Sequence, residues 1–104
     1  MDAETVFWEI AEDLYEDRAV SRSTMMGHPC LRVKGNFFAM LDRDSDRLIA
    51  KLDRARVQEL VAEGVGEVFS PAGRVFKEWV AVPNPDETRW RALVEEAKLF
   101  ATGG

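Results

Sequence analysis

The sequence predicts a single α+β domain over residues 1–104. Hydrophobic residues follow a helical spacing near both ends of the chain, over residues 4–17 and 84–101. Between them, over residues 30–52, the spacing changes to the alternation that is typical of strands. Because consecutive strands are followed by helices rather than alternating with them, the expected sheet is antiparallel and the helices are segregated from it.

Composition and charge exclude several classes of protein. The chain is 46% hydrophobic and 32% charged, an ordinary balance for a globular domain. No apolar run approaches the ~20 residues that span a bilayer, and the first residues lack the basic and apolar regions of a signal peptide. The single cysteine, Cys30, has no partner for an internal disulfide. We therefore expect a cytoplasmic protein that does not associate with membranes, and no cofactor is indicated.

The first predicted element is an amphipathic helix over residues 4–17. Its apolar face carries Phe7, Ile10 and Leu14, and acids fill the opposite face. The net charge of the chain is −5, yet residues 2–18 alone hold seven acids and one base. The acidity therefore belongs to this segment. Residues 18–23 are polar without periodicity, so we expect a loop there.

Three strands are predicted next, over residues 31–34, 37–41 and 47–52, as an antiparallel meander. Gly35-Asn36 is the expected first turn, of type II′ because glycine comes first. This register places Arg32 opposite Ala39 and Leu31 opposite Met40. It assigns four side chains to the core face: Leu31, Val33, Phe38 and Met40.

Cap signals delimit two further helices. Asp53 is the expected N-cap of a short helix that ends at Gly64. Short strands are expected at residues 68–69 and 78–82. For the last helix, Asn84 is the expected N-cap and Pro85 the first helical residue.

A set of short motifs then supports a family resemblance. They are Met25-Met26-Gly27, Val33-Lys34-Gly35-Asn36-Phe37-Phe38-Ala39, Leu48-Ile49-Ala50-Lys51-Leu52, Phe69-Ser70-Pro71 and Lys77-Glu78-Trp79-Val80-Ala81-Val82. In this order the stretch from residue 24 to residue 101 resembles the MmcQ/YjbR family and the related N-terminal domain of the TfoX/Sxy family. The resemblance implies a frataxin-like α+β fold. It also implies, by analogy alone, a link to DNA binding or to competence regulation.

Two surfaces are candidates for binding. On the meander, the face opposite the core carries cations and one aromatic ring, a combination that contacts phosphates and stacks bases. These candidate nucleic-acid-binding residues are Arg32, Lys34, Phe37, Arg47 and Lys51. On the first helix, carboxylates at helical spacing could hold cations weakly, as an acidic ridge does in frataxins. These candidate metal ligands are Glu9, Glu12, Asp13, Glu16 and Asp17.

Signals for catalysis are weaker. His28 and Cys30 are the only candidates for a base and a nucleophile, and no residue to orient them is identifiable. The tryptophans Trp8, Trp79 and Trp90 lie in core-forming patterns. The leading hypothesis is a non-enzymatic binding or interaction module, monomeric or homodimeric, whose partner is a protein or a nucleic acid. The alternatives are a nucleic-acid-associated regulator that uses the basic sheet face, and weak metal binding on the acidic helix.

Overall fold

Six antiparallel strands form one sheet in the computed structural model, which describes residues 2–103. The spatial order of the strands is β1-β2-β3-β4-β6-β5. The strands are β1 (Val20–Met25), β2 (His28–Val33), β3 (Asn36–Asp42), β4 (Arg47–Lys51), β5 (Glu67–Val68) and β6 (Trp79–Val82). The helices are α1 (Ala3–Leu14), α2 (Arg54–Ala62) and α3 (Glu87–Ala101), with a short 3-10 turn η1 at Pro71–Gly73. The predicted α+β class is confirmed.

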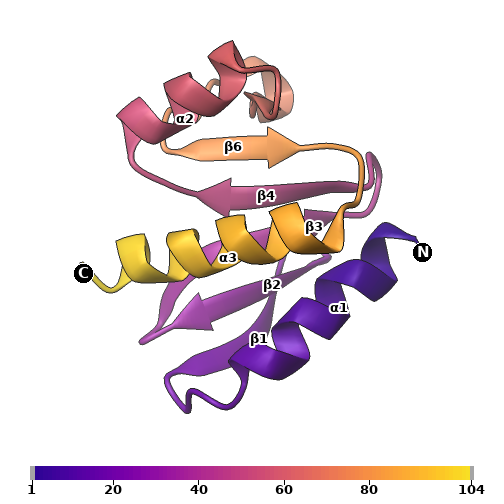
Figure 1. Cartoon of the computed structure of the whole chain (residues 1–104), viewed down its shortest axis with the longest axis vertical. Helices are drawn as coiled ribbons and strands as arrows, with labels where there is room; N and C mark the ends of the chain where they lie inside the picture. Colours follow the sequence, from indigo (N-terminus) through magenta and orange to yellow (C-terminus); the bar gives the residue numbers. More distant parts are fainter. Residues whose placement is uncertain (1, 104) are drawn as a thin grey trace.

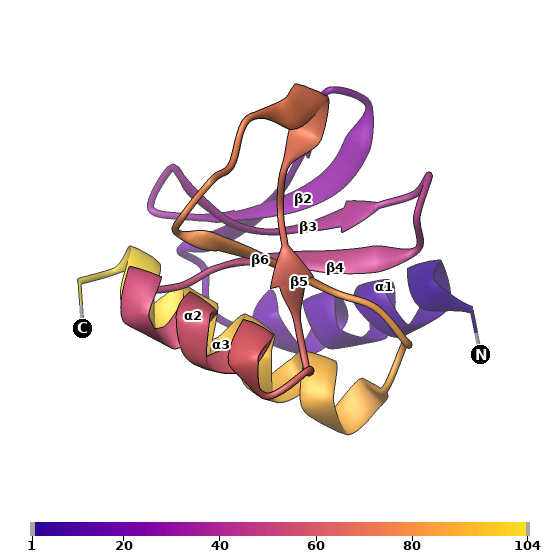
Figure 2. The same ribbon diagram turned by 90° about the horizontal axis from the view of Figure 1, so that it is seen from above.

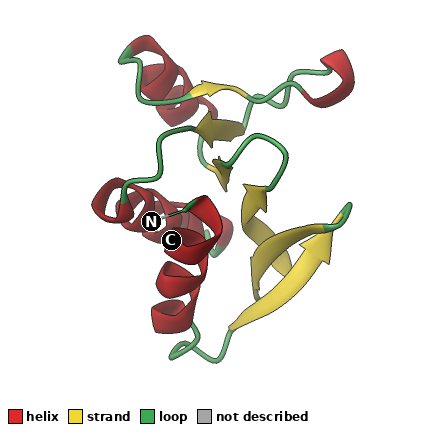
Figure 3. Cartoon of the chain, turned by 90° about the vertical axis from the view of Figure 1, so that its right-hand side faces the viewer, coloured by secondary structure: helices red, strands yellow, loops and turns green. Residues whose placement is uncertain are grey.

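All three helices pack on the same face of the sheet (Figures 1 and 2). Their apolar stripes and the inward side chains of the strands form the main core, in which Phe7, Phe38 and Trp90 are fully buried. Figure 3 shows the sheet with α1 and α3 on one side of it. The core burial of Trp90 is therefore confirmed, whereas Trp8 and Trp79 are only half-buried and pack at the margins of apolar clusters.

The opposite face of the sheet, which we call the distal face, has a second and smaller apolar cluster. Its buried members are Cys30, Met40, Ile49 and Ala81. The segment from residue 69 to residue 78 rises over this face beside the β1–β2 hairpin (Figure 2). The distal face is therefore lined by strands and by one irregular segment.

The prediction of a loop over residues 18–23 is wrong, because β1 begins at Val20 and pairs along its whole length with β2. Only Val20 is buried in the main core, and Ser21, Arg22 and Thr24 are exposed. An edge strand with one buried anchor shows no apolar alternation, so the periodicity of the sequence did not reveal it.

The predicted turn of the first hairpin is also one residue out of place. Its central residues are Lys34 and Gly35, with φ of 52° and 81°, as a type I′ turn requires, and Val33 pairs with Asn36. Arg32 therefore pairs with Phe37, and the register shifts after that pair so that Phe38 is the extra residue of a β-bulge.

This bulge moves Met40 from the predicted core face to the distal face. Leu31 now pairs with Ala39, and Met40 pairs with Cys30 in the second cluster. Leu31, Val33 and Phe38 remain in the main core, as expected.

The expected ends of α2 are confirmed. The Asp53 carboxylate accepts the Ala55 N–H at 3.1 Å, and Gly64 follows the helix with a φ of +76°. The expected start of α3 is wrong: Asp86 is the N-cap, accepting the Arg89 N–H at 3.1 Å, and Asn84 lies two residues earlier with a φ of 58°.

Two further expectations concern the short strands and membrane association. β5 lies at Glu67–Val68, one residue before the expected position, and β6 falls within the predicted 78–82 stretch. Among residues 2–103, none of the helices combines the length and the apolar composition needed to cross a membrane.

Candidate functional site

The distal face carries four of the five residues predicted for nucleic-acid binding. Strand alternation places Arg47 and Lys51 on the same side of β4 as the buried Ile49, and Arg32 pairs with Phe37 across β2 and β3. The fifth residue, Lys34, lies in the exposed turn that joins β2 to β3.

Arg32 and Phe37 form a cation–π pair, with the guanidinium carbon 4.1 Å from the ring centroid. The Nε of Arg32 is buried and has no hydrogen-bond partner within residues 2–103. No ion pair in that range involves the guanidinium. Arg32 is therefore a half-buried cation that contacts a neutral ring and has no carboxylate partner among the described residues, which leaves its charge available to an anion.

Arg47 is in a different state, because the fold already neutralises it. Its guanidinium contacts the Glu67 carboxylate at 3.0 Å and the Asp42 carboxylate at 3.7 Å, and its Nε donates to the Ser45 hydroxyl at 2.8 Å. Glu67 is twenty residues away in sequence. The structure therefore removes Arg47 from the set of free cations on the distal face.

Lys51 lies beside a ring that the sequence pattern assigned to the core and not to the site. Its Nζ is 5.9 Å from the centroid of Trp79, which pairs with it across β4 and β6. Arg74 lies similarly over Phe76, at 5.6 Å. Of these cations and Lys77, none takes part in an ion pair with another described residue.

The segment 69–79 therefore supplies candidate binding residues that the sequence patterns did not indicate. Phe69 and Phe76 pack against each other with centroids 5.8 Å apart. Together with Trp79 they enclose an apolar recess of about 220 Å³ whose other lining residues are Met25 and Met40. In the sequence, Arg74, Phe76 and Glu78 are spaced two apart, as on one face of an extended segment, and this spacing is the signal that could have indicated a cation beside a ring. The segment lies outside the predicted meander, however, and its sequence predicts only a loop followed by a strand.

Cys30 lies beneath this face as a packing residue. Its side chain is buried, and burial raises the pKa of the thiol, against the lowering effects of the Ser23 hydroxyl and the Arg32 charge. Because the thiolate is the nucleophilic form, a thiol with a raised pKa is a poor nucleophile at neutral pH.

The helix expected over residues 4–17 ends at Leu14, so Glu16 and Asp17 lie beyond α1. Two of the five predicted metal ligands are held by cations of α3. Asp13 contacts Arg91 at 2.6 Å, and Asp17 contacts Lys98 at 2.8 Å. The pKa of Asp17 is lowered, first by the Lys98 hydrogen bond and then by the Ala19 amide. The other three, Glu9, Glu12 and Glu16, are exposed. In the described chain, these five acids contribute no cluster of three ligand atoms of the kind that surrounds a metal ion.

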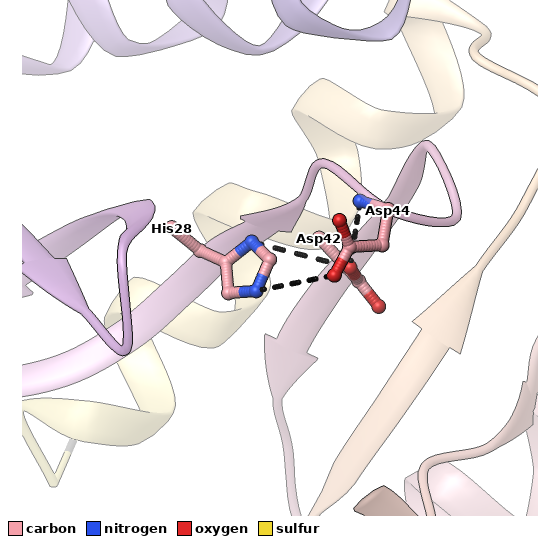
Figure 4. A group of neighbouring side chains, drawn as sticks. All are labelled: His28, Asp42 and Asp44. Atoms are coloured by element: carbon pink, nitrogen blue, oxygen red, sulfur yellow. Dashed lines mark hydrogen bonds and ion pairs between the residues drawn. The ribbon is translucent and has the colours of Figure 1, made fainter.

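A cluster of that kind occurs elsewhere, at His28, Asp42 and Asp44 (Figure 4). Nδ1 of His28 lies 4.0 Å from an Asp42 oxygen, and its Nε2 lies 4.0 Å from an Asp44 oxygen. The pairing of β2 with β3 and the turn after Asp42 bring these residues together, which the separate sequence positions did not reveal.

Neither carboxylate of this cluster is within hydrogen-bond distance of the imidazole, since both lie 4.0 Å from it. Nδ1 of His28 accepts the Arg43 backbone N–H at 3.2 Å, so the neutral ring carries its proton on Nε2. A metal at Nε2 requires the opposite tautomer, in which Nδ1 donates. The geometry therefore favours a structural role for His28 in closing the β3–β4 turn.

Comparison with family models, with curated proteins and with solved structures found no match for this chain. The functional assignment therefore rests on the geometry and chemistry of the chain itself.

Proposed function

We propose that this protein is a non-enzymatic binding module whose distal face binds single-stranded nucleic acid. The observation that carries the proposal is the set of three cation–ring pairs on that face: Arg32 with Phe37, Lys51 with Trp79, and Arg74 with Phe76. Proteins that bind single strands combine cations that contact the backbone with rings on which unpaired bases stack. A duplex offers few exposed base faces, so the rings favour a single strand.

The distribution of charge supports the same proposal. The acidic α1 packs on the helical side of the sheet, away from the distal face. Its Asp13 carboxylate pairs with Arg91, and Asp17, just after the helix, pairs with Lys98, which reduces the repulsion of a polyanion by this segment. The remaining predicted residue, Lys34, lies at the margin of the distal face and would extend the cationic path.

Membership of the MmcQ/YjbR family stays a proposal, supported by the order of the sequence motifs and by the α+β architecture. We also propose a cytoplasmic location, because the single Cys30 is a free thiol, as is usual in a reducing compartment. A protein partner on the same face is the competing hypothesis, and it predicts no dependence on exposed bases.

Fluorescence anisotropy with a labelled single-stranded oligonucleotide of about 12 nucleotides tests the proposal. We expect binding at about 50 mM salt that weakens steeply towards 200 mM, because bound cations release counterions from the phosphates. Replacing both Arg32→Gln and Lys51→Gln is expected to weaken binding and to lower the salt slope by about 0.7 for each phosphate that is no longer neutralised.

A charge-matched control is the double variant Arg18→Gln with Arg89→Gln, since both side chains are exposed and neither belongs to the three cation–ring pairs of the distal face. It is expected to bind almost as the unmodified protein does. Absence of binding at about 50 mM salt, or an equal loss in both double variants, would refute the distal face as a nucleic-acid site.

A further inference from the structure

A second apolar groove lies on the other side of Phe76 and Trp79, between α2 and the segment 68–79. Its volume is about 340 Å³. The apolar walls come from Val57 and Val61 on α2 and from Val68, Val75, Phe76 and Trp79 across the groove. Val68 and Val75 are 50% and 51% exposed, among the few large hydrophobic side chains that are open to solvent. A ligand that covers these two exposed side chains would gain binding free energy from the burial of apolar surface.

The charged groups of this groove have one sign. Arg54 and Lys77 stand among its lining residues, and no carboxylate does within the described residues. Both side chains are exposed, and neither forms an ion pair with another of residues 2–103. In a chain with a net charge of −5, this local excess of positive charge beside an apolar surface is complementary to an amphiphilic anion.

The size of the groove indicates a small ligand. Pockets for small molecules have volumes of about 300–1,000 Å³, mostly apolar walls and a few polar groups that fix orientation. The volume here lies at the lower end of that range. Two aromatic side chains in the walls, Phe76 and Trp79, favour a planar apolar body through stacked or edge-on contacts.

We propose that the groove between α2 and the segment 68–79 binds a small aromatic carboxylate. The ring system lies against Val61, Phe76 and Trp79, and the carboxylate is directed to Arg54 and Lys77 at the rim. This site is separate from the cations of Arg32 and Lys51, although Phe76 and Trp79 contribute to both surfaces.

The test is an NMR titration of protein labelled at its valine methyl groups with three probes that share one ring system: naphthylacetate, naphthylethanol and naphthylethylamine. We expect saturable shifts at Val57, Val61, Val68 and Val75 with naphthylacetate. The neutral alcohol is expected to bind about three- to tenfold more weakly, and the amine more weakly still, since exposed charge pairs contribute modestly.

Two variants distinguish the groove from non-specific adsorption. Arg54→Gln with Lys77→Gln removes the rim cations without touching the core, and it is expected to bring naphthylacetate down to the affinity of the alcohol. Arg89→Gln on α3 is the control and is expected to leave binding unchanged. Val61→Glu, which places a carboxylate inside the groove, is expected to abolish naphthylacetate binding and to leave oligonucleotide binding through Arg32 and Lys51 intact.

Three results would overturn the proposal. The first is equal affinity for the three probes, which would show that the rim cations do not select the ligand. The second is the absence of shifts at the four valines up to the solubility of naphthylacetate. The third is occupation of the groove by an acidic amphipathic peptide but not by naphthylacetate, which would assign the groove to a protein partner.

Discussion

Asp42 is the residue around which the turn between β3 and β4 is organised. Its carboxylate accepts the Asp44 N–H at 3.0 Å and the Ser45 hydroxyl at 2.9 Å, and it lies 3.7 Å from Arg47. Burial alone would raise the pKa of this carboxyl. The hydrogen bonds, together with the charges of His28 and Arg47, outweigh burial and lower the pKa below its ordinary value of 3.8.

The lowered pKa predicts an acid-sensitive contribution to stability. The ionised carboxylate stabilises the fold above pH 3.8, and this contribution is lost as the pH falls through the lower pKa of the folded state. We expect Asp42→Asn to lower the free energy of unfolding by about 1 kcal/mol at neutral pH and to flatten its decline in acid. Urea unfolding across this pH range measures both effects. If the free energy of unfolding of Asp42→Asn falls in acid as steeply as that of the exposed control Glu95→Gln, the role assigned to Asp42 is contradicted.

At Gly66 the fold requires a residue without a Cβ, although the backbone there does not have a positive φ. A Cβ at this position would overlap the Cγ2 of Val80 on β6. We expect Gly66→Ala to destabilise the protein by about 1–3 kcal/mol, as overpacking does in other cores. The double variant with Val80→Ala should recover part of this loss. Additive effects in thermal unfolding would argue against the contact.

The start of α3 depends on Asp86 rather than on Asn84. We expect Asp86→Ala to cost about 1 kcal/mol, because the Arg89 N–H loses its acceptor. Asn84→Gly is the matched control: the φ of 58° suits glycine, so its unfolding midpoint should change little. An equal loss in both variants would show that the cap was not the cause.

At the scale of elements, the exposed acids of α1 divide into paired and unpaired groups. Asp13 contacts Arg91 of α3, whereas Glu12 forms no ion pair with any other described residue. We expect Glu12→Gln to be neutral or to stabilise by about 0.2–0.5 kcal/mol, since the repulsion between Glu12 and Glu9, three residues apart on α1, is relieved. Asp13→Asn should destabilise by up to about 1 kcal/mol, the upper range for exposed ion pairs. Chemical denaturation of the two variants side by side tests this; the same sign for both would contradict it.

Periodicity and caps predicted most elements of this fold, and the failures have physical reasons. The helical stripe of Phe7, Ile10 and Leu14 and the alternation of β4 were visible because each buries a full face. The strand β1 was not visible, because an edge strand needs few buried residues. The turn was misplaced because Lys34 takes a positive φ, which a lysine seldom does and which its sequence context did not reveal.

For the molecule as a whole, alternation was enough to group Arg32, Phe37 and Lys51 on one face. It could not show that Arg47 is neutralised by Glu67, nor that Phe69, Phe76 and Trp79 come together over that face. These facts depend on contacts between distant segments, which local patterns of residues do not reveal. The cation–ring pairs that carry the proposed function are therefore partly a prediction of the sequence and partly a finding of the structure.

A backbone-amide NMR titration decides whether the distal face is the binding surface of this protein. The probe is a single-stranded oligonucleotide of about 12 nucleotides, added at about 50 mM salt. We expect the largest shifts on Arg32, Phe37, Lys51 and residues 74–79, with α1 and α3 little affected. Shifts concentrated on the two helices, or no shifts at this salt concentration, would contradict the proposed function.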